Sequence, residues 1–198
     1  MKLLIILVVS SGVVFGLSRF QSQAPEVPKD PWRVLIGKPA PAWHLNDWIN
    51  SEPISLSDLK GKVVLIRWWL ESCPYCKATA PSLNEFYQKY RDQDFVVVGM
   101  YHPKPKGRKV SQSEVTLFSE LKSFEFPIAI DQDWQTLHKY WPLNIEMDYT
   151  SVSFLLDKEG IIRYIHPGGS YSANGQPFNN PQWEKDYHEI KRNIEALL

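Results

Sequence analysis

The chain has 198 residues, of which 22 are Lys or Arg and 22 are Asp or Glu, and its formal net charge is +0. This length suits one domain with a sizeable core, and 43% hydrophobic and 22% charged residues are ordinary for a globular protein. The composition therefore excludes a disordered chain, a collagen-like chain and a polytopic membrane protein, and the balanced charge gives no general attraction for nucleic acid.

A mostly apolar stretch, residues 3–17, follows Met1 and Lys2 at the N-terminus. At about 1.5 Å per residue it spans roughly 22 Å, whereas a bilayer core is about 30 Å thick. Such a run is typical of a signal peptide, and an uncleaved anchor is the alternative. We therefore expect residues 1–18 to be a signal peptide or inner-membrane anchor, the only part to contact a membrane, and residues 19–35 to be a Pro-rich linker. Either interpretation places the rest of the chain in the periplasm or another extracytoplasmic space.

Strand and helix patterns alternate after the linker. Two mostly apolar runs have the length of strands that are buried on both faces, and Ser111 with Glu114 has the spacing of a capping box. The expected elements are a strand over 62–70, a helix following Cys76, a strand over 95–101, a helix over 111–124, a strand over 126–130, a helix over 134–141, a hairpin of 152–157 and 161–165, and a terminal helix over 182–198. This order predicts one α/β domain over residues 36–198, with a mixed sheet flanked by helices.

The only two cysteines, Cys73 and Cys76, follow the first predicted strand and begin the first predicted helix. Their spacing has three interpretations. Half of a zinc site needs a second pair of ligands, but no other cysteine occurs and the five histidines show no paired spacing. A structural disulfide would close too small a loop to stabilise the fold much. A redox-active dithiol is typical of Cys-x-x-Cys between a strand and a helix, and that context is present.

Helix geometry makes the two thiols unequal in this arrangement. Cys73 is expected at the N-cap, with Pro74 at the first helical position, where a missing N–H costs nothing. The helix dipole and the free amides at that end stabilise a thiolate. We therefore expect Cys73 to be the attacking nucleophile and Cys76, one turn inside the helix, to be the more shielded thiol that resolves a mixed disulfide.

Several stretches between Ile36 and Leu198 resemble exported thioredoxin-fold proteins of the TlpA/ResA type. They are the Gly-x-x-Ala-Pro opening of 37–43, the lead-in of 56–65, the active-site run of 68–76, Pro81 inside the following helix, and the Phe-Leu-Leu-Asp-Lys-Glu-Gly hairpin of 154–160. The resemblance implies a three-layer thioredoxin-like fold around a central mixed sheet. It also implies a thiol–disulfide oxidoreductase without a cofactor, whose partners are exported protein thiols and disulfides, for example in cytochrome or oxidase assembly. A membrane thiol reductase would be the electron donor, and the likeness favours reduction of the partner.

Three residues depart from the family pattern. Ser72 replaces the tryptophan that usually precedes the first cysteine. Ser151 stands where the family has a cis-proline, and because a cis bond before another residue costs about 3 kcal/mol, we expect a trans bond there. Arg67, six residues before Cys73, stands where many relatives have Asp or Asn.

Five residues near the cysteines are candidates for tuning the dithiol: Arg67, Glu71, Pro74, Tyr75 and Ser151. Arg67 is expected either to lower the pKa of the nucleophilic thiol by its charge or to pair with an acid such as Glu71 or Asp157. Glu71, two residues before the first cysteine, is either a proton relay to the second cysteine or a solvated loop acid. Tyr75, between the cysteines, is expected to set local packing and partner contact.

Two loops carry further patterns. Residues 104–109 hold four basic residues in six, which suits either a docking site for an acidic partner or a solvated loop. The run from His166 to Pro181 includes a stretch rich in Asn, Gly and Pro, and it forms a long irregular loop of a kind that is often functional.

We therefore expect an exported thiol–disulfide oxidoreductase that transfers two electrons through Cys73 and Cys76, with no metal at the site. A binding module stays open as the alternative: a copper or other metal chaperone that uses both cysteines with His102 or His166. A peroxidase is a further option because Ser151 departs toward that side of the superfamily, but the chain lacks the Pro-x-x-x-Thr-x-x-Cys stretch typical of such enzymes.

Overall fold

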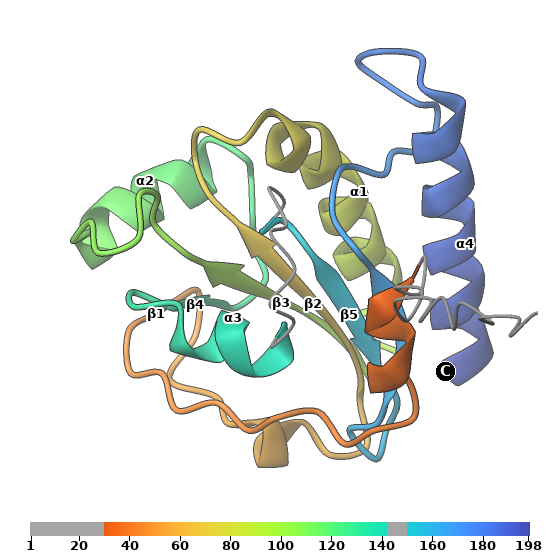
Figure 1. Ribbon diagram of the computed structural model, residues 1–198, viewed down its shortest axis with the longest axis horizontal. Coiled ribbons are helices and arrows are strands. Elements are labelled where there is room, and N and C mark those ends of the chain that lie inside the picture. Colours follow the sequence, from red (N-terminus) through yellow and green to blue (C-terminus); the bar gives the residue numbers. More distant parts are fainter. Residues whose placement is uncertain (1–29, 142–149) are drawn as a thin grey trace, which may run out of the picture.

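The computed structural model describes residues 30–141 and 150–198 (Figure 1). The expected signal or anchor segment, residues 1–18, lies outside these ranges, and so do residues 19–29 of the expected linker. Within the described ranges, no helix has the length and apolar character needed to cross a bilayer.

One mixed sheet organises the domain, and its strands follow the order β1-β4-β3-β2-β5-β6. The central strands β2, β3 and β4 are parallel, whereas β1, β5 and β6 each run antiparallel to their neighbours. The elements are η1 (Pro31–Leu35), β1 (Trp48–Ile49), η2 (Leu56–Leu59), β2 (Val63–Trp69), α1 (Pro74–Tyr90), β3 (Phe95–Tyr101), α2 (Gln112–Glu120), β4 (Ile128–Ile130), α3 (Gln135–Tyr140), β5 (Ser153–Leu156), β6 (Ile162–His166) and α4 (Pro181–Leu197). The predicted mixed sheet is confirmed, and its apolar parallel strands are buried on both faces.

Helices cover both faces of the sheet, which gives three layers (Figure 1). On one face, α1 packs over β3 and α4 packs over β6, through buried residues that include Phe86 and Ile190. On the other face, α3 and the two 3₁₀ helices pack around Trp68 and Tyr140, whose ring centroids are 5.1 Å apart. Arg67 of β2 donates a hydrogen bond to Thr79 of α1, so its side chain lies on the α1 side of the sheet. The next residue, Trp68, points to the opposite face, because successive side chains of a strand alternate.

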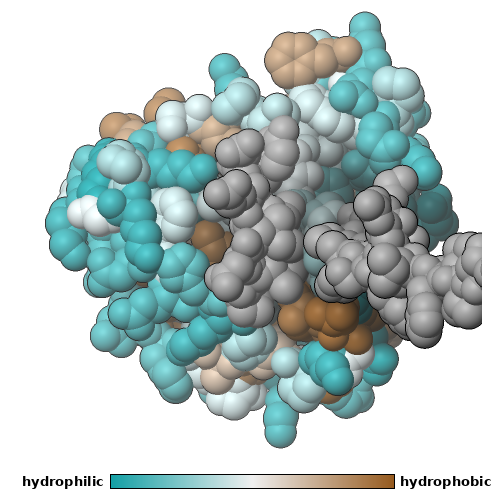
Figure 2. All heavy atoms as spheres, in the orientation of Figure 1, coloured by the Kyte–Doolittle hydropathy of each residue, from teal (hydrophilic) through white to brown (hydrophobic). Residues whose placement is uncertain are grey.

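The segment before residue 36 is part of the folded unit from Pro31 onward. These residues form η1, and the Trp32 ring stacks on Trp141 with centroids 6.1 Å apart. Val34 remains 63% exposed, and Figure 2 shows an apolar patch over this helix. The last residues of the expected linker are thus ordered against the sheet.

Some elements differ from the sequence-based expectation in their existence or their ends. No sequence pattern indicates β1, which is only two residues long and is held by pairing of Trp48 with Ala129 of β4. The predicted helix 111–124 ends at Glu120, because the chain turns there and Ser123 adopts a left-handed φ of 55°. Its predicted capping box at Ser111 is confirmed.

Candidate active site

The dithiol lies where β2 ends and α1 begins. Cys73 is the N-cap of α1, and its Sγ accepts a hydrogen bond from the backbone N–H of Cys76 at 3.2 Å. Pro74 occupies the first helical position, where its missing N–H leaves no bond unmade. Cys76 is 2% exposed, whereas Cys73 is half-buried, and both are free thiols. The predicted N-cap, the predicted proline position and the shielding of the second thiol are confirmed.

These surroundings move the pKa values of the two thiols in opposite directions. The hydrogen bond with the Cys76 thiol has the largest effect on Cys73 and, with the Cys76 backbone N–H and the charge of Arg67, lowers the pKa of Cys73 from 9.0 to about 6 against the opposing effect of burial. Burial, assisted by the bond to Cys73, raises the pKa of Cys76 well above its usual value. At neutral pH the site therefore holds one thiolate and one protonated thiol.

Arg67 lies buried beneath α1, with 0% of its surface exposed. Its guanidinium donates hydrogen bonds to Ser153 Oγ at 3.2 Å, to Thr79 Oγ1 at 3.5 Å and to the Gly169 carbonyl at 2.8 Å. It also lies over the ring of Tyr171, with 5.3 Å from Cζ to the ring centroid. All of these partners are uncharged, and Nε has no hydrogen-bond partner within the described residues.

The expected alternative partners of Arg67 are bound elsewhere. Glu71 accepts a hydrogen bond from Tyr101 Oη at 2.6 Å and pairs with Arg108 at 2.7 Å. Asp157 pairs with Arg163 and accepts backbone N–H groups of the hairpin turn. The interpretation of Arg67 as one half of an ion pair with either acid is therefore wrong.

The same contacts define the place of Glu71. Its carboxylate is held by Tyr101 and Arg108 on the side of β3 and the basic loop, and no hydrogen bond joins it to either cysteine in the described part of the chain. Arg108 belongs to the basic run 104–109 and also approaches Glu114 at 3.6 Å. Glu71 thus anchors this loop beside the dithiol. No local sequence pattern indicates this contact, because Glu71 and Arg108 are far apart in the chain.

A cleft of about 250 Å³ opens over Cys73. Ser151 borders this cleft, and its side chain contributes to the lowered pKa of the Cys73 thiol. Within the described residues, cis peptide bonds precede only Pro105 and Pro177, so the bond before Ser151 is trans, as predicted. Lys104 also lines the cleft, which places the start of the basic loop beside Cys73.

Tyr75, between the cysteines, contacts α4. Its ring meets that of Trp183 edge to face, with centroids 6.2 Å apart. Trp183 in turn contacts the ring of Phe178 at 5.5 Å, so an aromatic row joins the active-site turn to the loop before α4. The expected packing role of Tyr75 therefore extends into the long irregular loop.

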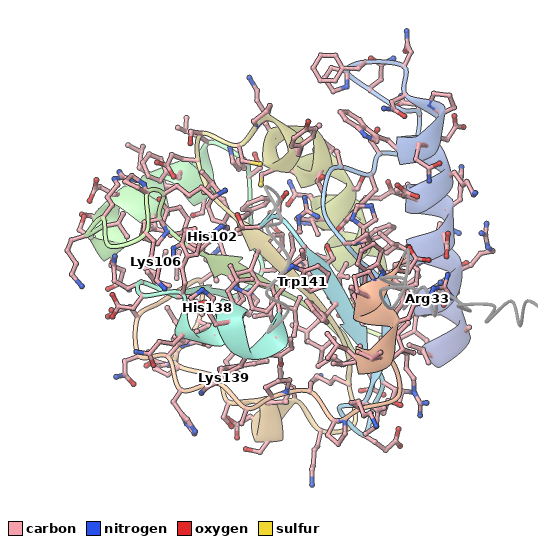
Figure 3. All side chains as sticks on the ribbon, viewed as in Figure 1. Arg33, His102, Lys106, His138, Lys139 and Trp141 are labelled. Atoms are coloured by element: carbon pink, nitrogen blue, oxygen red, sulfur yellow. The ribbon has the colours of Figure 1, made fainter. Side chains whose placement is uncertain are left out.

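The two histidines considered for a metal site are both buried. His102, labelled in Figure 3, contacts Thr150 Oγ1 through Nε2 at 2.6 Å, and burial lowers its pKa to about 3. His166 is paired with Asp186 at 3.2 Å. No group of three or more His, Cys, Asp or Glu side chains that could hold a metal ion occurs in residues 30–141 and 150–198.

Comparisons with known proteins agree with this architecture. Protein DipZ of Mycobacterium bovis is 32% identical over 137 residues, which cover 65% of this chain but only 18% of DipZ. A thiol-disulfide oxidoreductase ResA of Bacillus cereus is 29% identical over 133 residues, or 66% of this chain and 69% of ResA. The crystal structure assigned to thiol:disulfide interchange protein DsbE from Chlorobium tepidum matches with a TM-score of 0.63 and 24% identity, over 82% of this chain and 96% of that one.

The structural likeness, at that level of identity, supports the thioredoxin fold alone. Family membership comes from the sequence profile of the AhpC/TSA family, which matches residues 36–165. That range contains the whole sheet except the last residue of β6, and it contains the dithiol at the start of α1. The chain therefore belongs to the AhpC/TSA family.

Proposed function

We propose that this protein is a thiol–disulfide oxidoreductase that acts on exported protein partners through Cys73 and Cys76. The observation that carries the proposal is the half-buried Cys73 at a helix N-cap with a pKa lowered to about 6, one turn from a buried thiol. An accessible thiolate attacks the partner disulfide, and the buried neighbouring thiol then resolves the mixed disulfide. Relatives such as ResA, named thiol-disulfide oxidoreductase, support the same activity.

The reaction follows from the two thiols. The Cys73 thiolate attacks one sulfur of a partner disulfide, so that a mixed disulfide forms and the other partner sulfur leaves as a thiolate. Cys76 then loses its proton and attacks the Cys73 sulfur, which releases the second partner thiolate and leaves a Cys73–Cys76 disulfide. Two electrons pass from the protein dithiol to the partner, and the released thiolates take up protons according to their own pKa values.

Arg67 is proposed to be the positioning residue that supplies charge to this step. Taking a guanidinium out of water costs several kcal/mol unless a negative group compensates it. No carboxylate does so within the described residues, while the charge of Arg67 lowers the pKa of both Cys73 and Cys76. The thiolates that form during exchange, on Cys73 in the reduced protein and on Cys76 in the mixed disulfide, are thus its counter-ions.

The direction of transfer is proposed to be reduction of the partner, with a membrane thiol reductase as the electron donor and residues 1–18 as the export signal or anchor. Exported thiols, as in cytochrome or oxidase assembly, fit the resemblance to TlpA/ResA-type proteins. The reduction potential tests the direction: a value below about −200 mV suits a reductant, whereas a value near about −120 mV suits an oxidant.

The activity is tested by trapping. A Cys76→Ser protein should accumulate mixed disulfides between Cys73 and exported partners, because the resolving thiol is gone. A Cys73→Ser protein is the matched control and should capture none. If Cys76→Ser also captures none, and the wild type reduces no disulfide substrate, the proposed function is wrong.

A further inference from the structure

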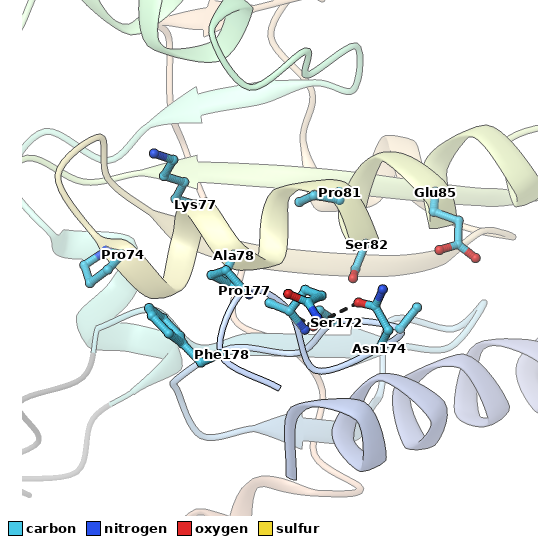
Figure 4. A pocket seen from close by; sticks show the side chains of 12 residues that line it. Pro74, Lys77, Ala78, Pro81, Ser82, Glu85, Ser172, Asn174, Pro177 and Phe178 are labelled. Atoms are coloured by element: carbon cyan, nitrogen blue, oxygen red, sulfur yellow. Dashed lines mark hydrogen bonds between the residues drawn. The ribbon is translucent and has the colours of Figure 1, made fainter. Parts of the chain in front are cut away.

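A groove of about 710 Å³ lies beside the dithiol, between α1 and the loop that precedes α4 (Figure 4). One wall comes from α1, between Pro74 and Glu85, and the other from the loop, between Ser172 and Phe178. Pro74 also lines the cleft over Cys73, so the groove begins directly beside the nucleophile.

The groove is apolar at the end that meets the active site. Pro74, Ala78 and Pro81 lie on one face of α1, at the spacing that the helical repeat brings together. Pro177 and Phe178 form the opposite wall, as Figure 4 shows. Phe178 is 67% exposed, and an exposed apolar surface bordered by polar side chains marks an interaction site.

Hydrogen bonds fix the loop that forms this wall. Ser172 Oγ donates to the Gln176 carbonyl at 3.0 Å, and the Asn180 N–H donates to the Gly175 carbonyl at 2.9 Å. A Cβ on Gly175 would lie 2.7 Å from the Asn180 backbone nitrogen, so only glycine allows this turn. The edge-to-face contact of Phe178 with Trp183 holds the ring in place. The wall is therefore preformed, which lowers the cost of binding.

We propose that this groove binds an aromatic or large aliphatic side chain of the partner polypeptide, close in sequence to the partner cysteine that reacts with Cys73. The inference rests on the proposed function, because the occupant is the partner in the mixed disulfide. The cysteine of a partner chain that is bonded to the Cys73 sulfur lies next to Pro74, where the groove begins. From there, each extended residue of the partner advances about 3.3 Å. A side chain two residues from the reacting cysteine thus reaches the apolar end of the groove, whose volume is in the range of ligand pockets.

The test compares two peptide disulfides that are identical except for Phe or Ser at the second position on each side of the cysteine. The reduced full-length protein should react with the Phe peptide about tenfold faster, because the groove removes the ring from water. Phe178→Ala should lose most of this preference. Leu117→Ala, on α2 and likewise exposed (53%), is the matched control and should keep it. Hydroxyethyl disulfide, too small to reach the groove, should react equally with all three proteins.

Equal rates for the two peptides with the wild type, or an unchanged preference in Phe178→Ala, would overturn the inference. It would equally be overturned if the peptides reacted alike and Phe178→Ala abolished a concentration-dependent dimer, because the groove would then bind a second copy of the chain. If no protein form reacts with hydroxyethyl disulfide, the proposed function fails instead. In that event, the affinity of a Cys73→Ser protein for the two peptides tests the groove independently, with tighter binding of the Phe peptide expected.

Discussion

Arg67 and Arg108 both lie near the dithiol, but only Arg108 has carboxylate partners among the described residues. Arg108 is partly exposed and contacts Glu71 at 2.7 Å and Glu114 at 3.6 Å. Arg67 is buried, and its described partners are uncharged oxygens and an aromatic ring. Arg108, neutralised near the surface, holds a loop in place. Arg67, which has no carboxylate partner within the described residues, instead lowers the pKa of the two thiols. The two arginines should therefore respond differently to the same substitution.

The largest expected effect is that of Arg67→Met on the reactive thiol. Loss of the nearby charge should raise the pKa of Cys73 from about 6 to roughly 7. Because the reduced protein is then less stabilised at pH 7, the reduction potential should become more negative, on the order of 20 mV. The ultraviolet absorbance of the thiolate across a pH titration measures the first change, and equilibrium with glutathione measures the second.

Arg67→Lys separates charge from structure in that experiment. The lysine keeps a positive charge but cannot reproduce the forked hydrogen bonds to Ser153, Thr79 and Gly169. The pKa of Cys73 should stay closer to the wild-type value than in Arg67→Met. Equal pKa values in the wild type and Arg67→Met would remove Arg67 from the mechanism.

The stability of the reduced protein should depend on pH for the same reason. The pKa of Cys73 is about 6 in the folded protein, below its usual value of 9.0, so between these values the unfolded chain binds more protons. The free energy of unfolding of the reduced wild type should therefore rise from pH 6 toward pH 9 and fall as pH drops through 6. Urea titrations should show this rise weakened in Arg67→Met, retained in Arg108→Met and absent from the oxidised protein.

Arg108→Met should have a smaller effect, confined to stability. Its ion pair with Glu71 is partly exposed, and such pairs contribute little to stability. The free energy of unfolding should therefore fall only slightly, while the pKa of Cys73 stays at its wild-type value. A pKa change as large as that of Arg67→Met would contradict the distinction between the two arginines.

The smallest effect is expected for Ser151→Ala. The Ser151 hydroxyl makes the least of the contributions that lower the pKa of Cys73, after those of Cys76 and Arg67. Its removal should therefore raise the pKa of Cys73 by less than Arg67→Met does, in the same absorbance titration. A larger rise than in Arg67→Met would make the Ser151 loop, instead of Arg67, the main external support of the thiolate.

Local patterns predict the features that depend on neighbouring residues. The apolar runs predict β2 and β3, and the position of Cys73 before Pro74 predicts the N-cap, because both follow from strand and helix geometry over a few residues. The two-residue strand at Trp48 has no such pattern, since only its pairing with β4 orders it.

Features that depend on distant contacts do not follow from the sequence. The charge of Arg67 is visible in the sequence, but the lack of a carboxylate beside it among the described residues depends on Glu71 and Asp157 binding other arginines. The groove beside Cys73 likewise requires the loop around Phe178 to lie against α1. In both cases the relevant partners come from separate parts of the chain, and the fold alone brings them together.

The central claim is that Cys73 is the thiolate nucleophile and Cys76 the protected thiol. Alkylation of the reduced protein over a range of pH, with the modified residue located by mass spectrometry, tests it most directly. Cys73 should be modified first, with a midpoint near pH 6, and Cys76 should stay unmodified in the folded protein. A midpoint near the ordinary thiol value of 9.0, or modification of Cys76 first, would contradict the claim.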